Sequence, residues 1–279
     1  MTAILKTTVI QEPSSAVNNI TLGTDGTLTT GSNMTVTGTA VMSSPYTMRN
    51  KIINGAMVID QRNAGASITP TNGQYSVDRW YYQVTQSSKL TAQQSSIAAT
   101  GFINSVLTTS SSAYTVTASD AFNISQNIEG YNIADLAWGT SSAQTVMLSF
   151  WVRSSLTGTF GGCVSNSAYN RSYPFTYSIS SANTWEQKTI TIPGDTTGTW
   201  LTTNGVGVRI YFGLGVGSTY SGTAGVWAAA NYFSATGATS VVGTNGATFY
   251  ITGVQLERGT IATPFEYRNY QQELAMCQR

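Results

Sequence analysis

Turn signals divide most of this sequence into short runs in which apolar and polar residues alternate. Glycine, often beside asparagine, marks the breaks, which are Asn63-Ala64-Gly65, Thr71-Asn72-Gly73, Gly158, Gly161-Gly162, Pro193-Gly194-Asp195, Asn204-Gly205 and Asn245-Gly246. Such residues form tight turns, whereas the runs between them have the alternating period of half-buried strands. The pattern therefore predicts an all-β protein.

Eight runs in the larger part of the chain have this strand character, at 78–86, 112–118, 121–129, 145–153, 173–179, 185–192, 206–214 and 247–256. In the fourth run, Leu148, Phe150 and Val152 share one fully apolar face, while Trp151 lies among polar residues on the other face. About eight such strands are typical of a two-sheet jelly roll. A helical period appears only at 269–279.

Residues 1–48 differ from the rest, because their short alternating runs hold too few apolar residues to close a core within one copy. These apolar residues are Ile20, Leu22, Leu28, Met34, Val36 and Val41. Two interpretations remain open: strands that intertwine with other copies or dock on a partner, and a flexible Thr/Gly linker. We expect an extended N-terminal β-rich attachment segment at 1–48, a hinge at Ser43-Ser44-Pro45, and an antiparallel jelly-roll β-sandwich at 49–279.

The charge of the chain excludes several kinds of partner. Charged side chains make up only 9% of the residues and the net charge is +1, with no cluster of Lys or Arg that would bind phosphates. Nucleic acid is therefore not an expected partner. No run of about 18 apolar residues predicts membrane insertion. The first six residues, 1–6, lack the features of a signal peptide, so we expect synthesis in the cytoplasm without secretory export.

Few residues of this chain are suited to catalysis. The sequence has no histidine, which removes the usual general base and the nucleophile and zinc sites that depend on it. Cys163 and Cys277 are expected to be free, buried thiols. Paired carboxylates remain, as in glycoside hydrolases, but we interpret the acids as ion-pair partners at strand ends. The acids are Asp60, Asp78, Asp120, Glu129, Asp135, Glu186, Asp195, Glu257 and Glu266.

A structural calcium ion is the only metal that the acids suggest. Asp60, Asp120 or Asp195 could ligate calcium, but no acidic run has the spacing of coordinating residues. We therefore expect a protein that is not an enzyme and that requires no cofactor.

Aromatic residues are abundant beside so few charges, with six Trp and fifteen Tyr. Trp80, Trp151 and Trp185 fall in predicted strands and are expected in the core. Others lie in or near predicted loops, including the long stretch 213–246, together with amide and Arg side chains. Sugar rings stack on such aromatic planes while their hydroxyl groups bind amides. The residues predicted to contact a glycan are Tyr169, Arg171, Trp200, Tyr220, Trp227, Asn231 and Tyr232. Packing between subunits is the alternative for this loop set.

The stretch from Gly253 to Arg268 reads as a last strand, a turn at Arg258-Gly259 and an extended exit at Thr263-Pro264-Phe265-Glu266. It resembles the closing signature of a β-sandwich domain common in bacteriophage tail-fibre and virion-surface proteins, especially those of cyanophages and other marine phages. Further motifs appear in the order of that family. They are Asn54-Gly55-Ala56-Met57 with Gln61-Arg62, Val77-Asp78-Arg79-Trp80-Tyr81, Gln126-Asn127-Ile128-Glu129-Gly130, Leu148-Ser149-Phe150-Trp151-Val152-Arg153 and Asn183-Thr184-Trp185-Glu186.

The resemblance covers about residues 49–279 and implies a virion structural protein, either a tail fibre or a fibre or decoration on the capsid, present as a homotrimer. Residues 1–48 would then attach it to other virion proteins, and the sandwich would bind host-surface polysaccharide. Members of that family continue beyond the segment that matches Glu273 to Arg279, whereas this sequence stops there. Two alternatives remain: a purely structural cement protein, and a depolymerase that cuts host polysaccharide.

Overall fold

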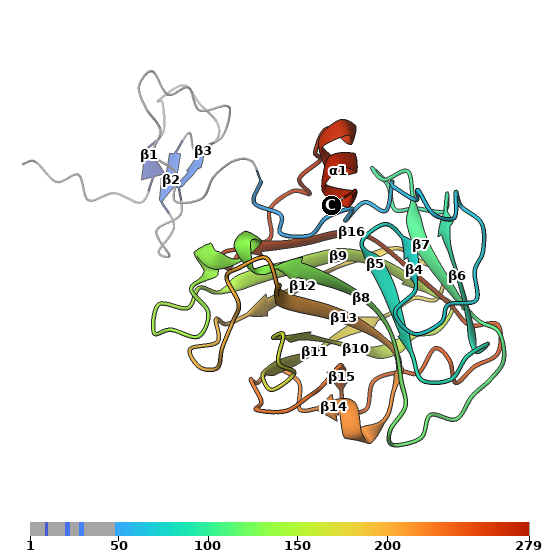
Figure 1. Cartoon of the computed structure of the whole chain (residues 1–279). Coiled ribbons are helices and arrows are strands. Elements are labelled where there is room, and N and C mark those ends of the chain that lie inside the picture. Colours follow the sequence, from blue (N-terminus) through green and yellow to red (C-terminus); the bar gives the residue numbers. More distant parts are fainter. Residues whose placement is uncertain (1–8, 11–19, 23–27, 31–47, 279) are drawn as a thin grey trace, which may run out of the picture. The chain divides into compact units, whose positions relative to one another are not determined.

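The computed structural model describes residues 9–10, 20–22, 28–30 and 48–278 (Figure 1). The chain divides into two compact units, 1–43 and 44–279. In the first unit, three short strands form an antiparallel sheet: β1 (Val9–Ile10), β2 (Ile20–Leu22) and β3 (Leu28–Thr30). Strand character predicted at Ile20, Leu22 and Leu28 is thus present. The expectations for Met34, Val36, Val41 and the hinge lie outside the described residues.

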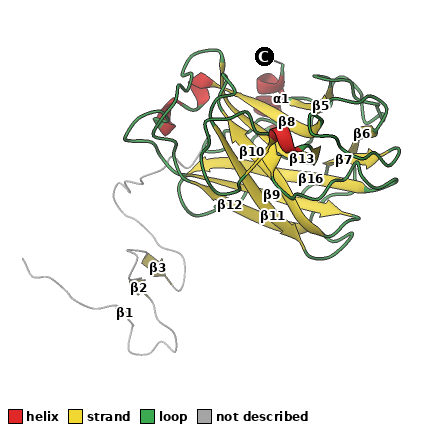
Figure 2. Cartoon of the chain, turned by 90° about the horizontal axis from the view of Figure 1, so that it is seen from below, coloured by secondary structure: helices red, strands yellow, loops and turns green. Residues whose placement is uncertain are grey.

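The second unit contains two large antiparallel sheets (Figure 2). The six-stranded sheet contains, in spatial order, β11 (Ser172–Ile179), β10 (Gly158–Ser165), β13 (Val206–Val216), β8 (Ala121–Glu129), β5 (Trp80–Val84) and β4 (Tyr75–Val77). The five-stranded sheet contains β12 (Glu186–Ile192), β9 (Val146–Ser154), β16 (Thr248–Arg258), β7 (Ser105–Ser110) and β6 (Leu90–Ser95). The unit is a jelly-roll β-sandwich, which confirms the predicted fold class.

The core lies between the two sheets. Leu148, Phe150 and Val152 of β9 are fully buried, so the predicted apolar face of this strand is confirmed. Phe150 meets Phe212 of the opposite sheet edge to face, with 5.0 Å between ring centroids, and Phe212 in turn lies 6.2 Å from Trp80. Burial of these rings is the main source of stability for the sandwich.

The strand predictions are correct where apolar and polar residues alternate and wrong in three respects. Residues 112–118 form no strand, and the structure adds β4, β6, β7 and β10 to the two large sheets, of which the last three are rich in Ser, Thr, Gln or Gly. Gly161-Gly162 is not a turn but lies inside β10. A Cβ at Gly161 would lie 2.4 Å from the Ser234 hydroxyl oxygen, and one at Gly162 would lie 2.4 Å from the Phe175 ring. These glycines are therefore required by close packing rather than by a turn.

The three tryptophans predicted for the core differ in burial. Trp80 is fully buried, as expected. Trp151 and Trp185 are only half-buried, so the prediction is wrong for them. Trp151 belongs to the outer face of β9, and Trp185 precedes β12 and meets the Tyr250 ring edge to face at 6.1 Å. The outer face of the five-stranded sheet thus carries aromatic rings that cover the backbone without entering the core.

The long stretch predicted at 213–246 begins inside β13 and becomes a loop after Val216. The loop contains η3 (Ser218–Tyr220), β14 (Ser221–Gly222) and β15 (Ser234–Ala235), and it packs on the outer face of the six-stranded sheet through Phe233. Two further short helices, η1 (Gly130–Asn132) and η2 (Ala134–Leu136), follow β8. This loop therefore covers one part of the outer face and leaves another part open.

The predicted C-terminal helix is confirmed as α1 (Tyr270–Cys277), which Asn269 caps by accepting a hydrogen bond from the Gln271 backbone. Its buried Cys277, with Leu274 and Met276 beside it, packs on Ile53 and Ile59. Within the described part of the chain, no helix has both the length and the apolar character needed to cross a membrane.

Candidate functional site

Many residues of the motifs quoted above hold the first loop of the domain, around residues 53–59, against β5 and β8. The Asn54 side-chain amide donates to the Ile59 and Asp78 carbonyl oxygens, while the Asn54 backbone carbonyl accepts from Trp80 Nε1. Gln126 bonds both the backbone N–H and the carbonyl of Ile53. These buried polar groups satisfy backbone atoms that no strand partner reaches, so they stabilise the fold rather than form a reactive site.

Most of the candidate acids have a basic partner. Glu257 pairs with Arg49, Asp135 with Lys51 and Glu186 with Lys188, while Arg268 lies between Glu266 and Glu273. The partner of Glu257 is therefore distant in sequence and is not the adjacent Arg258. These contacts agree with the interpretation of the acids as ion-pair partners.

Asp60 and Asp120 bind their own loops instead. Asp60 accepts from the backbone of Asn63 and Gly65. Although burial alone would raise the pKa of Asp120, hydrogen bonds from Thr117, Thr85 and Tyr114 lower it to about 2. Among the residues that the structure describes, no group of three acidic or cysteine side chains could hold a metal ion.

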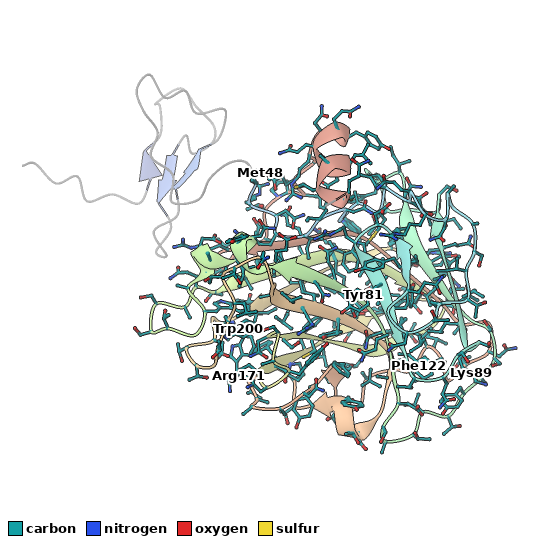
Figure 3. All side chains as sticks on the ribbon, viewed as in Figure 1. Met48, Tyr81, Lys89, Phe122, Arg171 and Trp200 are labelled. Carbon is teal, nitrogen blue, oxygen red and sulfur yellow. The ribbon has the colours of Figure 1, made fainter. Side chains whose placement is uncertain are left out.

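Three of the residues predicted to bind a glycan belong to a packed aromatic cluster. Trp200 is buried, and its ring lies 4.7 Å from Trp138 and 5.5 Å from the half-buried Trp227. Trp227 donates from Nε1 to the Pro193 carbonyl at 2.8 Å. Arg171, which lies near Trp200 in Figure 3, binds both carboxylate oxygens of Asp195 at 2.7 Å. In this arrangement the cluster anchors loops, and the Trp200 ring offers no open face.

Of the other four predicted residues, the three tyrosines pack around Phe233 on the outer face of the six-stranded sheet. Tyr220 and Tyr232 are half-buried against the cluster that contains Phe233, and Asn231 is half-buried beside them in sequence. Tyr169 is more open, with 40% of its surface exposed, and touches Phe233 edge to face. The role of these four residues in glycan binding stays a prediction.

Several side chains that the sequence analysis did not single out lie on the outer face near Tyr169, because alternation along β5, β8 and β13 turns them outward. Tyr81 of β5 points outward because its neighbours Trp80 and Tyr82 are buried in the core. In β8 and β13 the same alternation turns Asn127 and Arg209 outward, and these two residues are opposite one another in the sheet. Cross-strand pairing thus gathers aromatic and amide side chains on one open part of the outer face.

We call Tyr75, Tyr81, Asn127, Tyr169 and Arg209 the outer-face site. The Tyr75 and Tyr81 rings lie 5.7 Å apart, and the Tyr81 hydroxyl donates to Asn127 Oδ1 at 3.1 Å. The Arg209 guanidinium lies 4.0 Å from the Tyr169 ring centroid and donates to the Asn166 carbonyl. Because neighbours hold each group, the rings are fixed before any ligand arrives.

A hollow of about 220 Å³ adjoins this site, lined by Tyr75, Arg79, Asn127, Ile128, Glu129, Asn204, Gly205 and Val206. It is smaller than the roughly 300–1,000 Å³ of enclosed ligand pockets. Burial and the nearby Tyr169 phenol raise the pKa of Tyr81 to about 12. The phenol therefore stays protonated well above neutral pH and, with its proton donated to Asn127 Oδ1, its oxygen can accept a hydrogen bond from a ligand.

Sequence reasoning missed four of the five residues of the outer-face site. The available signal was the run Trp80-Tyr81-Tyr82, in which alternation must turn the middle ring away from the core. The proximity of Tyr169 to this run depends on the order of strands in the sheet, which the sequence pattern does not supply.

No protein-family model and no curated protein matches the chain. Solved structures share part of its fold at low identity. They include the enzymatically active domain of tailspike protein 4 of bacteriophage CBA120, with 13% identity over 75% of this chain and a TM-score of 0.40. This chain spans 21% of that tailspike domain.

Carbohydrate-binding modules are also among the similar structures. The family 11 module of Clostridium thermocellum, in complex with a mixed-linked tetrasaccharide, has 13% identity, covers 68% of this chain and 94% of its own, and gives a TM-score of 0.35. TmCBM61, in complex with β-1,4-galactotriose, has 14% identity to this chain and a TM-score of 0.34. The match covers 67% of this chain and 92% of TmCBM61. Similarity this distant assigns no ligand to this chain.

Proposed function

We propose that this chain is a bacteriophage virion structural protein, a homotrimeric fibre on tail or capsid, whose jelly-roll domain binds host-surface glycans at the outer-face site. The virion assignment rests on the ordered motifs between residues 49 and 279. In this proposal residues 1–48 attach the protein to other virion proteins. The protein is made in the host cytoplasm and leaves the cell by lysis, so it needs no export signal.

The observation that carries glycan binding is the outer-face site itself. Its tyrosine rings offer apolar planes for the C–H faces of a sugar, and Tyr169 is 40% exposed. Asn127 and the protonated Tyr81 lie beside these planes and can bind hydroxyl groups. A shallow site of this kind gives weak affinity per copy, and several copies on one particle would make attachment effective.

Binding of the intact protein to host polysaccharide and to a glycan array tests this function. Tyr169→Ala should lower affinity about tenfold or more, since stacking on one ring contributes roughly 1–3 kcal/mol in comparable sites. Tyr169→Phe keeps the ring and should bind nearly as well as wild type. Equal binding by all three proteins would refute the role of the ring.

Salt dependence gives a second test of the same proposal. Contacts made by rings and neutral amides are weakly screened, so binding should change little between low and high salt. A steep loss of binding with salt would show that charged groups such as Arg209 dominate instead.

We propose that the protein is not an enzyme. The depolymerase alternative predicts released oligosaccharide after incubation with host polysaccharide, and the cement alternative predicts particle binding without glycan binding. Each alternative therefore has a different outcome in the same set of assays.

A further inference from the structure

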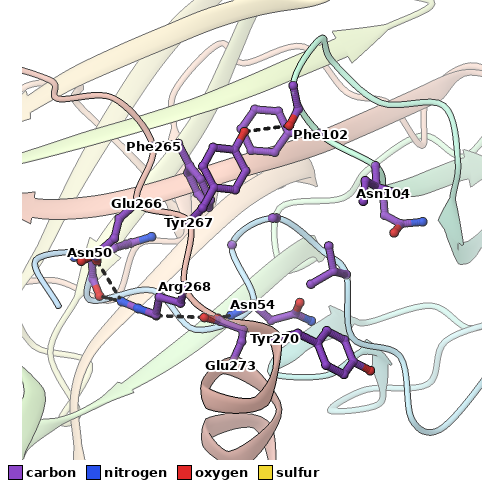
Figure 4. Close-up of a pocket in the computed structure, with 15 residues that line it drawn as sticks. Asn50, Asn54, Phe102, Asn104, Phe265, Glu266, Tyr267, Arg268, Tyr270 and Glu273 are labelled. Atoms are coloured by element: carbon purple, nitrogen blue, oxygen red, sulfur yellow. Dashed lines mark hydrogen bonds and ion pairs between the residues drawn. The ribbon is translucent and has the colours of Figure 1, made fainter. Parts of the chain in front are cut away.

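Three adjoining hollows lie beside α1, and Arg268 lines all three. The first has a volume of about 370 Å³ and lies between three loop segments, around 50–58, 101–104 and 265–273. Figure 4 shows the aromatic rings that line it, with the Arg268 and Glu273 side chains nearby. Its apolar wall is made chiefly by Phe102, Ile103, Phe265, Tyr267 and Tyr270.

Contacts within the fold hold the wall of the first hollow in place. Phe102 packs against Phe265 at 5.1 Å and against Tyr267 at 5.7 Å, and Phe265 lies 4.9 Å from Tyr267. The Tyr267 hydroxyl donates to the Gly101 carbonyl at 2.8 Å. Beneath Phe102 lies Gly253, where a Cβ would come within 2.5 Å of the ring. The hollow is therefore formed in the free protein.

The rim of these hollows is exposed and apolar. Ile103, Tyr267 and Tyr270 of the first hollow are 76%, 62% and 56% exposed, and Met48 and Tyr131 of the adjoining hollows are 47% and 61% exposed. We call these five residues the association surface. They make up half of the ten large hydrophobic side chains that are exposed in the described part of the chain. Exposed apolar side chains that lie together in this way mark a surface that another macromolecule covers.

Charge on this surface is balanced. The hollows are lined by three basic side chains, Arg49, Lys51 and Arg268, and by three acidic ones, Asp135, Glu266 and Glu273. All six take part in ion pairs within the fold. A charged partner therefore gains little here, whereas a copy of the same surface can approach without repulsion between like charges.

We propose that copies of this chain pack against one another at the association surface, around the axis of a homo-oligomer. This rests on the proposed homotrimer and adds where its jelly-roll domains meet. Residues 1–47 precede Met48, whose sulfur accepts a hydrogen bond from Gln272 of α1 at 3.1 Å. If these residues from several copies join one fibre, the domains must converge at this end. Residues close to a rotation axis meet their own copies, which suits a neutral apolar surface.

Cross-linking of the intact protein tests the proposal directly. Ile103→Cys places a thiol on the association surface, while Val226→Cys places one at a site of 51% exposure in the loop after β13. The native Cys163 and Cys277 are buried free thiols and should stay silent. A short bismaleimide should join chains of the Ile103→Cys protein and not those of the Val226→Cys protein. Equal cross-linking of both variants, or none in either, would overturn the proposal and leave the surface to a glycan or another virion protein.

A charge variant measures the energetic contribution of the same surface. Tyr270→Glu puts like charges together near the axis and should weaken association at least tenfold in sedimentation equilibrium, while Val226→Glu should not. Unchanged association of the Tyr270→Glu protein together with absent cross-linking overturns the inference, as does a monomeric wild-type protein. Glycan binding at the outer-face site is read separately in the same proteins, so the association surface and the glycan site can each fail without the other, whereas a monomeric wild-type protein would also remove the homotrimer from the proposed function.

Discussion

Trp80 provides a stringent test of how the core and the motif residues depend on one another. Its side chain is fully buried, packs 6.2 Å from Phe212, and donates a hydrogen bond of 3.1 Å to the Asn54 carbonyl. Trp80→Ala removes the ring, which costs about 3–5 kcal/mol for a buried aromatic side chain. It also removes one of two hydrogen bonds to the Asn54 backbone carbonyl, which still accepts from the Met57 backbone N–H, and this adds about 0.5–1.5 kcal/mol. We therefore expect a loss of unfolding free energy of about 3.5–6.5 kcal/mol.

Urea unfolding of the intact protein, followed by fluorescence and circular dichroism, measures this loss. The urea concentration at the midpoint should fall, while the dependence of the unfolding free energy on urea concentration stays the same. Trp80→Phe separates the two contributions, because it keeps most of the packing and removes the donor. It should cost about 0.5–1.5 kcal/mol for the lost hydrogen bond, since the Asn54 backbone carbonyl still accepts from the Met57 backbone N–H. Trp151→Ala is the matched control, since that ring is half-buried, and should cost about 1–2 kcal/mol. A Trp80→Ala protein no less stable than Trp151→Ala would refute the assignment of Trp80 to the core.

Three further outcomes follow from the structure. Trp227→Ala should lower stability by about 2 kcal/mol in the same unfolding assay, since ring pairs such as that with Trp138 contribute roughly 0.5–1.5 kcal/mol each. A change in glycan binding alone would contradict that packing role. The carboxylate of Asp120, with its pKa lowered from 3.8 to about 2, stabilises the fold above pH 3.8 and loses this effect as the pH falls toward 2. In the Asp120→Asn protein, the free energy of unfolding should therefore fall less steeply between pH 3.8 and about 2 than in the wild type. The same steepness in both proteins would contradict this. Burial raises the pKa of the Cys163 thiol, and raises that of Cys277 to about 12, so neither should react with a thiol reagent until the protein unfolds; rapid labelling of the folded protein would contradict this.

The sequence predicted most of the sandwich because its central strands alternate regularly. Runs at 121–129 and 145–153 correspond closely to β8 and β9. Strands such as β6 and β7 were missed because their outward positions hold Gln and Thr and their inward positions include Ala and Ser, which weakens the contrast between faces. At 112–118 alternation is present, but Tyr114 and the Thr117 backbone bind Asp120 instead of a neighbouring strand.

The candidate site was harder to predict, because it is made by neighbours in space. The aromatic residues in predicted loops suggested a glycan-binding site there. Two of them, Trp200 and Trp227, instead pack on each other and on Trp138. Loop position alone does not separate a ring that binds a ligand from one that anchors the loop. The outer-face site depends instead on cross-strand pairs such as Tyr75 with Tyr81, which become visible only when strand order is known.

Contacts between the two ends of the jelly-roll domain have a consequence for its synthesis. The Glu266 carboxylate accepts from the Asn50 backbone, 216 positions earlier, and Arg268 donates to the Asn50 and Ile52 carbonyls. Residues 265–273 must therefore be synthesised before the first loop of the domain can settle, so this loop completes its folding late although it comes first in the chain. Chains that terminate before Glu266 would lack these contacts and would leave the Asn50 and Ile52 backbone groups without their C-terminal partners.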